Sequence, residues 1–169
     1  HSFDGAYGGL WRRNGRPPQL LAGVGFSAQG KFEGSYYRRT AESRAPDLAW
    51  MFEGIEDQEI LGDFGFSGGG AAGFELDRAD VRLGTPEEVR VVASSENHTS
   101  SFVLVPEEML THITNWPGEE EQQKLIRSDI VYFRTPSGGE VFSTGSITFC
   151  GSLPWNDFDN NISRLLENV

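Results

Sequence analysis

The residue with the clearest chemical potential is Glu53, which lies in the apolar stretch 47–55. If this stretch is a β-strand, alternate side chains point to opposite faces, and Glu53 is the only charge in the middle of two apolar faces. Burying an unpaired carboxylate costs several kcal/mol, so we expect Glu53 to be protonated, ion-paired or bound to a metal ion. A structural ion pair with one of the chain's arginines is the commoner explanation of a buried glutamate.

Glu96 and His98 form a second candidate pair. Both lie in a polar turn expected over residues 94–100, between strands expected at 89–93 and 102–105. A carboxylate and an imidazole beside a strand end can exchange protons with a substrate, because histidine titrates near neutral pH. A solvent-exposed turn without a chemical role is the commoner explanation of the same two residues.

The other reactive side chains are predicted to be structural. Tyr36 and Tyr37 can supply phenol oxygens, but buried tyrosines most often satisfy a structural hydrogen bond. Cys150, the only cysteine, closes an apolar segment and is predicted to be a small buried hydrophobe rather than a nucleophile. His112 follows a short helix that is expected to begin at Pro106, and we assign it no role.

Composition restricts the classes of partner. The chain has 169 residues, with 14 lysines and arginines against 25 aspartates and glutamates, so its net charge is −11. A nucleic-acid backbone or an anionic membrane needs a positive protein face, so neither is expected as a partner. The sequence contains no apolar run of about 18 residues that would span a membrane. A single cysteine excludes an internal disulfide and favours a reducing, cytoplasmic compartment.

The glycine-rich run at residues 67–73 is not predicted to bind phosphate. It lacks the Gly-Lys-Ser/Thr ending of a phosphate loop and continues into Phe74-Glu-Leu-Asp77 rather than into a helix. We expect these glycines to allow close backbone approach or turns with positive φ. The Gly-x-Ser-x-Gly, His-Glu-x-x-His and dinucleotide-binding motifs are also missing, which argues against three common classes of enzyme site.

The pattern of elements predicts a mixed α/β, strand-rich fold, in which the high glycine and aromatic content favours strands and turns. A strand, a glycine turn, a second strand and a helix at the C-terminus are typical of the closing part of an α/β layer. The helix is expected from an apolar stripe at residues 158, 162, 165, 166 and 169. The predicted strands cover residues 20–26, 47–55, 60–66, 73–76, 89–93, 102–105, 128–135 and 140–149.

Residues 1–169 are expected to form a single domain or a fragment of a larger domain. An antiparallel β-rich insertion is expected over residues 20–105, and closing strands with the terminal helix over residues 125–169. The sequence opens on His1 without a methionine and ends inside the predicted helix. We therefore expect a longer polypeptide, whose front part would hold part of any active site.

Several long strings of this sequence are specific rather than generic. They include Tyr7-Gly-Gly-Leu-Trp-Arg-Arg-Asn-Gly-Arg-Pro-Pro18 and Phe52-Glu-Gly-Ile55, and others at residues 24–30, 60–65, 68–77, 141–147, 150–152 and 159–164. Together they extend over nearly the whole chain. The chain resembles the C-terminal region of the N,N-dimethylformamidase large (beta) subunit family.

The resemblance implies a fold, an activity and partners. The fold would be the C-terminal part of a class I glutamine amidotransferase-like layered domain. The activity would be that of a metal-dependent amidohydrolase, which cleaves a small N-substituted amide such as dimethylformamide to a carboxylic acid and an amine. The partners would be the small amide substrate, the rest of the large subunit and a small subunit.

The resemblance further implies a mononuclear iron, as Fe(III), held by two tyrosines and one glutamate. The glutamate would be Glu53, and the tyrosines are expected before His1, so these residues would supply at most one of three ligands. Phenolate and carboxylate oxygens are hard donors that suit Fe(III). Glu96 or His98 would then protonate the departing amine.

A different class of function stays open. The chain would then be a non-catalytic carbohydrate- or subunit-binding module of a larger protein. Its aromatic and glycine content, and the lack of the implied tyrosine ligands within these residues, support this alternative.

Overall fold

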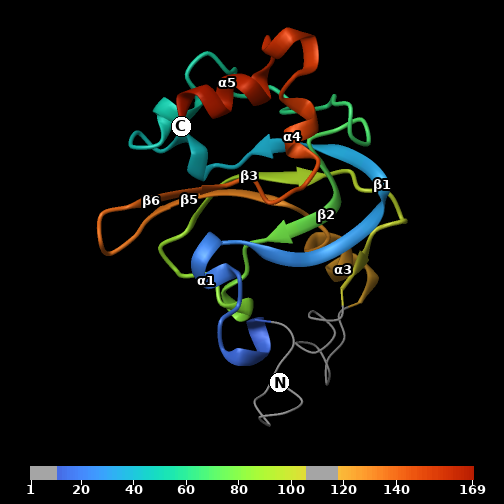
Figure 1. Ribbon diagram of the computed structural model, residues 1–169, viewed down its shortest axis with the longest axis vertical. Coiled ribbons are helices and arrows are strands. Elements are labelled where there is room, and N and C mark those ends of the chain that lie inside the picture. Colours follow the sequence, from blue (N-terminus) through green and yellow to red (C-terminus); the bar gives the residue numbers. More distant parts are fainter. Residues whose placement is uncertain (1–10, 106–117) are drawn as a thin grey trace, which may run out of the picture.

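The computed structural model describes residues 11–105 and 118–169. Its centre is a six-stranded antiparallel sheet in the order β2-β1-β3-β5-β6, with the short β4 paired to β1. The sheet curls into a half-barrel (Figure 1). The strands are β1 (Gly25–Arg39), β2 (Ala72–Arg78), β3 (Arg90–Glu96), β4 (Val103–Leu104), β5 (Asp129–Arg134) and β6 (Glu140–Ser143).

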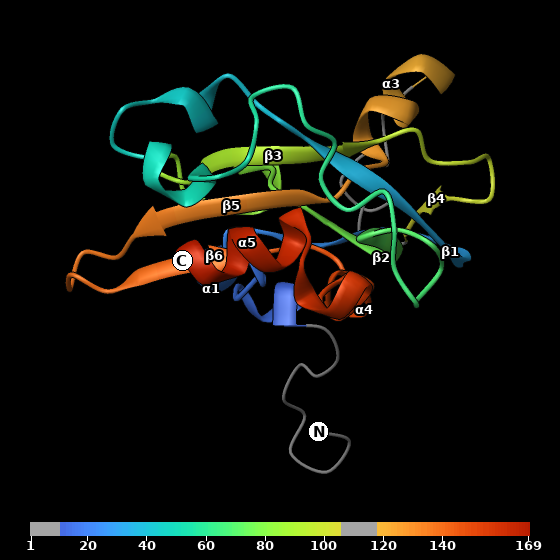
Figure 2. The same ribbon diagram turned by 90° about the horizontal axis from the view of Figure 1, so that it is seen from above.

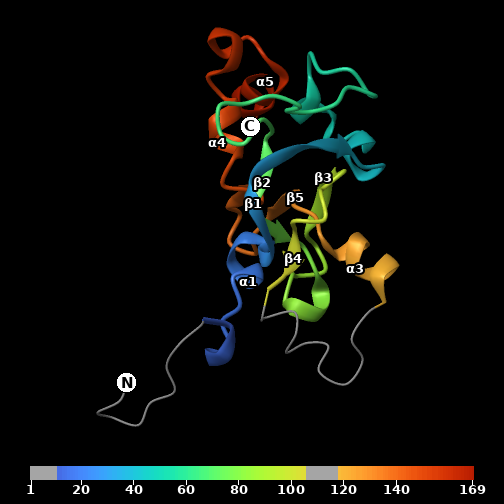
Figure 3. The same ribbon diagram turned by 90° about the vertical axis from the view of Figure 1, so that its right-hand side faces the viewer.

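The helices are short and lie on the outside of this sheet. In Figure 1, α4 and α5 lie above the sheet and α1 lies below it, while α3 lies on the side away from α4 and α5 (Figure 3). The α-helices are α1 (Gln19–Ala22), α3 (Glu119–Leu125), α4 (Phe149–Ser152) and α5 (Asn161–Asn168). The 3-10 helices are η1 (Trp11–Asn14), η2 (Glu42–Arg44), η3 (Ala49–Phe52), η4 (Val81–Leu83) and η5 (Trp155–Phe158).

The long strand β1 organises the sheet, and Figure 2 shows it crossing the direction of β3 and β5. Residues 25–35 of β1 pair with β2, residues 28–29 pair also with β4, and the last four residues, 36–39, pair with β3. The register with β2 shifts between Gln29 and Gly34, where the glycine-rich segment approaches closely. A Cβ atom at Gly34 would lie 2.5 Å from the Gly70 oxygen, and one at Gly73 would lie 2.2 Å from the Glu33 oxygen. The expected close backbone approach of these glycines is confirmed.

The segment after β6 returns to β2 and is hydrogen-bonded to it, which joins the two edges of the curled sheet. The Asp77 amide donates to the Gly145 oxygen over 2.8 Å, and the Gly73 amide donates to Ser146 Oγ over 2.8 Å. Leu76 and Ser146 also form an isolated antiparallel bridge. Residues far apart in the sequence are thereby joined at one seam of the half-barrel.

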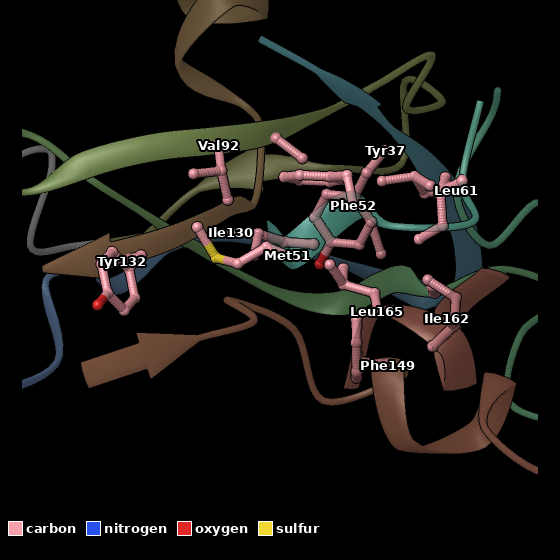
Figure 4. Close-up of a cluster of buried hydrophobic side chains, with 14 of the residues drawn as sticks. Tyr37, Met51, Phe52, Leu61, Val92, Ile130, Tyr132, Phe149, Ile162 and Leu165 are labelled. Atoms are coloured by element: carbon pink, nitrogen blue, oxygen red, sulfur yellow. The ribbon is translucent and has the colours of Figure 1, made fainter. Parts of the chain in front are cut away.

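The main hydrophobic core lies between the sheet and the layer formed by η3, α4 and α5. Figure 4 shows side chains of the sheet and of this layer meeting in one cluster. Burial of this apolar surface holds the short helices in place, because helices of this length are not stable by themselves. The cluster includes Tyr37, Met51, Phe52, Leu61, Val92, Ile130, Tyr132, Phe149, Ile162 and Leu165.

The expected glutamine amidotransferase-like α/β layer is wrong. The strands pair antiparallel, and β5 and β6 continue the same sheet through β3. In the described part of the chain the longest α-helix is α5, with eight residues, so no helix resembles the long crossover that joins parallel strands. The C-terminal strand–turn–strand unit was correctly expected, but it closes an antiparallel sheet.

Several expected strands are also replaced by other elements. Residues 47–55 contain η3, because the buried residues of this stretch, Leu48, Met51, Phe52 and Ile55, follow the spacing of a helix rather than that of a strand. Residues 20–26 contain the end of α1, residues 60–66 contribute only a bridge at Leu61, and the strand expected at 140–149 ends at Ser143.

The strands expected at 73–76, 89–93, 102–105 and 128–135 are confirmed, with shifted ends. The terminal helix is confirmed as α5, whose Ile162 and Leu165 are fully buried, whereas Phe158 and Leu166 are exposed. The helix expected at Pro106 and residue His112 lie outside the described residues. Among the described residues, no helix combines the length and apolar character needed to cross a membrane.

Candidate functional site

Glu96 and His98 line one groove, at the end of β3. Glu96 ends the strand, and Asn97 turns the chain with a φ of +63°. The opposite wall comes from α3 and the residues that follow it. The groove has a volume of about 590 Å³, and its lining includes Ser95, Glu96, His98, Phe102, Gln122 and Arg127.

His98 is held inside the wall of the groove rather than presented to solvent. Its ring lies 4.8 Å from the Phe102 ring, and its Nε2 lies 2.6 Å from Ser95 Oγ. Burial lowers the pKa of His98 from 6.5 to about 4, while the negative charge of Glu33 acts in the opposite direction. The imidazole is therefore neutral at pH 7.

Ser95 links this imidazole to the residue before β5. Ser95 Oγ accepts the Ser128 amide over 2.7 Å and shares a hydrogen bond with His98 Nε2, in which the tautomer of the ring decides which atom donates. His98 Nδ1 is buried and has no hydrogen-bond partner within the described part of the chain.

A polar network continues from Ser128 into the core. Ser128 Oγ lies 2.9 Å from the Tyr37 hydroxyl and donates to the Gly145 oxygen over 2.6 Å. The Tyr37 hydroxyl donates to the Thr144 oxygen over 2.7 Å. Tyr37 is fully buried, and this burial raises the pKa of its phenol, which stays neutral. The expectation that Tyr37 is a buried, hydrogen-bonded tyrosine is confirmed.

The Ser95–His98 contact does not provide the chemistry of a nucleophile and its base. Ser95 is only 5% exposed, and its oxygen already accepts a backbone amide. An imidazole with a pKa of about 4 is a weak base at neutral pH. The contact instead ties the turn after β3 to the start of β5.

Glu96 has partners of its own and points away from this network. It is exposed and forms an ion pair with Arg38, whose guanidinium lies over the Tyr36 ring, 5.6 Å from its centre. Its backbone oxygen accepts the Ser35 hydroxyl over 2.5 Å. The groove therefore brings Glu96 and His98 into one wall but does not join them as a hydrogen-bonded pair.

Glu53 lies on the opposite layer, directly after η3. It is exposed, so the expectation of a buried carboxylate is wrong, because the stretch folds as a 3-10 helix that buries Met51 and Phe52 instead. Asn168 Nδ2 of α5 donates to the backbone oxygens of both Met51 and Glu53, each over 3.0 Å. Gly54 follows with a φ of +78°. The Glu53 carboxylate is thus solvent-accessible, and the backbone that carries it is held by α5.

A polar hollow of about 280 Å³ lies beside this turn, where α5 meets Gly54. Its side chains are paired with each other: Asn161 Nδ2 donates to Glu59 Oε1 over 2.7 Å, and Arg164 pairs with Glu167 over 3.0 Å. Within residues 11–105 and 118–169, no three His, Cys, Asp or Glu side chains are grouped so that they could hold a metal ion. Glu53 could therefore be one ligand of a metal, but the described carboxylates, imidazole and thiol do not form a complete site.

The structure differs from the sequence-based predictions at Cys150, whose predicted burial is wrong, and at Asp77, whose environment was not predicted. Cys150 is exposed, because the segment from Phe149 is helical and turns Phe149 inward and Cys150 outward. Asp77 is half-buried, and burial, aided by Glu75, raises the pKa of its carboxyl to about 6. The alternation of side chains in β2 places Asp77 with Glu75 on the face opposite the buried Leu76, so it did not indicate this partial burial. The seam at Asp77 is formed by residues far away in the sequence.

Comparisons with known proteins place these features in context. A family model described as N,N-dimethylformamidase beta subunit-like, C-terminal, matches residues 1–161. The chain is similar to the N,N-dimethylformamidase beta subunits of Alcaligenes sp and Paracoccus aminophilus, with 40% identity to each over all 169 residues. These residues cover 22% of each relative. The chain thus spans about a fifth of the length of the curated relatives it matches.

Proposed function

Because the chain belongs to the N,N-dimethylformamidase beta subunit-like, C-terminal family, we propose that it is one part of the large subunit of an amide hydrolase. The observation that carries this proposal is the 40% identity over the entire chain to two proteins named as beta subunits of that enzyme. The proposed reaction is hydrolysis of a small N-substituted amide, such as dimethylformamide, to a carboxylic acid and an amine. The proposed setting is the cytoplasm, in a complex with a small subunit.

Glu53 is the proposed contribution of this chain to an iron centre. Its carboxylate is a hard oxygen donor that suits Fe(III), and its exposure leaves room for ligands from outside the described residues. The two remaining ligands are the tyrosines expected before His1. A ferric ion bound there would supply Lewis acidity toward the amide carbonyl. The chain's own residues position the carboxylate by fixing the backbone of the turn, through the hydrogen bonds of Asn168 with that backbone.

This proposal is tested by replacing Glu53 with glutamine in a subunit of the relatives' length, purified together with its small subunit. We expect most of the iron to be lost and kcat to fall by about 100-fold or more, because changes of residues that only support a metal ligand already cost 10–100-fold. Glu56→Gln is the matched control, since Glu56 is exposed, lies three residues further along the chain and is not a proposed metal ligand. Full iron content in Glu53→Gln, measured by elemental analysis, would reject Glu53 as a ligand.

Glu96 and His98 are the proposed candidates for the group that protonates the departing amine. Their presence in one groove supports the proposal, whereas the low pKa of His98, the ion pair of Glu96 with Arg38 and the position of the groove away from Glu53 count against it. Glu96→Gln and His98→Gln are compared at equal iron content. A loss of about 100-fold in kcat identifies the general acid, because positioned proton transfer contributes on that order. Unchanged kcat in both variants removes the pair from the mechanism.

The alternative of a non-catalytic binding module makes the opposite prediction for Glu53. In that case Glu53→Gln, like Glu56→Gln, leaves both iron content and turnover of the assembled enzyme unchanged. Assembly of the complex would then be the property that depends on this chain.

A further inference from the structure

We propose that the aromatic cluster Phe64, Phe66 and Trp155 is a docking surface for another region of the same large subunit. The proposal rests on the proposed function, since it takes the chain to be one part of such a subunit. Phe66 is 70% exposed and Trp155 is 39% exposed. The centres of their rings lie 5.3 Å apart, and the Phe64 ring stacks on Trp155 at 5.9 Å with an angle of 21° between the ring planes.

The segment that carries Phe66 is hydrogen-bonded to α4, so the fold itself keeps the Phe66 ring exposed. The Phe66 amide donates to the Gly151 oxygen over 3.0 Å, and Ser152 Oγ donates to the Phe64 oxygen over 2.6 Å. A Cβ atom at Gly65 would lie 2.5 Å from Ser152 Oγ, which shows how closely the two segments pack. An ordered exposed ring of this kind is prepared for binding, because little conformational entropy remains to be lost.

The turn that carries Trp155 is held in an unusual conformation. Asn156, Asp157 and Phe158 follow one another with φ values of 50°, 53° and 68°, a left-handed turn without glycine. Asparagine and aspartate tolerate this region, whereas phenylalanine rarely adopts it. Asn160 Nδ2 stabilises the turn by donating to the Trp155 oxygen over 2.7 Å. The turn leaves Phe158 62% exposed, and conformations of this kind are concentrated at functional positions.

The charges around the cluster define the chemistry of the partner. Exposed acidic side chains follow or precede the aromatic residues directly in the chain, and Arg164 of α5 pairs with Glu167. A partner segment with apolar side chains flanked by lysine or arginine is complementary to this surface. An anionic membrane is not complementary to this acidic surface. The acidic residues are Asp63, Asp157, Asp159 and Glu167.

The occupant is a protein segment rather than a sugar. A sugar stacks on an open aromatic face, but Trp155 has Phe64 on one side and Phe66 tilted against it. The relatives supply the reason to place the partner in the same polypeptide. The matched residues make up only 22% of each relative, so most of the large subunit lies outside this chain. Aromatic anchors with a polar rim are typical of such protein–protein contacts.

Hydroxyl-radical footprinting of a large subunit of the relatives' length, kept monomeric and free of the small subunit, tests the proposal. Trp11 is the internal control, because it is 67% exposed and lies on η1, which is on the other side of the sheet from α4 and α5 (Figure 1). We expect Phe66 and Trp155 to be oxidised several-fold more slowly than Trp11. Equal oxidation rates would overturn the proposal. Protection that is seen only after the small subunit is added, or only in a dimer, would also overturn it, because the occupant would then be another chain.

Two variants make the assignment specific. In the same monomeric subunit, Phe66→Ser is expected to raise the oxidation rate of Trp155 several-fold, whereas Trp11→Ser leaves it unchanged. An unchanged rate in Phe66→Ser would contradict the proposal. Iron content is measured in parallel, so a failed role for Glu53 and a failed docking surface give different results.

Discussion

The groove between the end of β3 and α3 lies on the side away from α4 and α5, as the positions of these helices in Figure 3 show. Glu53, after η3, and Trp155, on η5, belong to the layer of α4 and α5, and the polar and aromatic groups of the two regions differ in their exposure. In the groove, His98 is held by Ser95, and Ser95 is held by Ser128. On the other face, the Glu53 carboxylate and the Phe66 ring are exposed. In the groove region the polar side chains are hydrogen-bonded within the chain, whereas on the other face the charged and aromatic side chains are exposed to solvent.

This difference indicates which of the two regions contributes to the stability of the fold. A buried polar network that is satisfied by its own chain rigidifies a core, and losing one member leaves its partners unpaired. An exposed group on a fixed backbone adds little to stability and is available to a partner. Substitutions in the groove region should therefore change the free energy of unfolding, and substitutions on the other face should change iron binding or subunit contacts.

The largest effect on stability is expected for Asp129→Ala. Asp129 is fully buried, and its carboxylate accepts the Ala79 amide over 3.0 Å, Ser94 Oγ over 2.7 Å and Arg127 Nε over 3.0 Å. Removing it leaves three donors unpaired, one of them charged. We expect the free energy of unfolding, measured by urea titration, to fall by about 3–5 kcal/mol.

The control for this prediction is Glu140→Ala, which breaks the exposed pair between Glu140 and Arg134, 2.9 Å apart. Exposed pairs contribute little, so a change within about 0.5 kcal/mol is expected. A similar small change for Asp129→Ala would show that the buried network does not support the fold.

The next effect is a loss of stability in acid that comes from His98. Its pKa is lowered to about 4 in the folded chain, below its ordinary value of 6.5, so the unfolded chain binds a proton first as the pH falls. Stability should therefore decrease from about pH 6.5 down to about pH 4, by about 2–3 kcal/mol. Urea titrations between pH 4 and pH 8 should show this slope in the unmodified chain and a flatter one in His98→Gln. Equal slopes would mean that His98 is freely protonated in the folded chain.

Asp77 is expected to act in the opposite direction over nearly the same range. Burial raises the pKa of its carboxyl to about 6, so the folded chain keeps a proton that the unfolded chain has already lost. The stability contributed by the neutral carboxyl is lost as the pH rises from about 4 to about 6. Asp77→Asn should therefore stabilise the chain at pH 7.5 by about 1–2 kcal/mol and have little effect at pH 4. A destabilised Asp77→Asn at pH 7.5 would indicate an ionised, partnered carboxylate.

The sequence was informative where local pattern determines the structure. The strands that became β3 and β5 were predicted from short β-branched runs with turns at their ends, and the terminal helix from its buried stripe at Ile162 and Leu165. The stretch around Glu53 was misinterpreted, because a short segment with apolar residues on both faces fits a strand or a helical turn equally well. The packing of Met51 and Phe52 against the sheet and α5 accompanies the helical turn.

The candidate site was less predictable, because its geometry depends on residues far apart in the sequence. Nothing near His98 indicates that Ser128 orients Ser95, thirty-three residues earlier in the chain. The left-handed turn is hinted at by Asn156 and Asp157, which tolerate positive φ, but not by Phe158. The exposure of Cys150 likewise follows from a helix that the apolar run around it did not indicate.

The smallest effect on stability is expected for Phe66→Ser, which tests whether the exposed aromatic face contributes to the stability of the fold. The ring is 70% exposed and is tilted against Trp155, so little apolar surface becomes exposed when it is removed. The free energy of unfolding of the chain should change by less than about 0.5 kcal/mol, as for other surface substitutions. A loss of about 2 kcal/mol or more in a urea titration would make Phe66 a part of the core, and the outward-facing region would then serve the fold as the groove does.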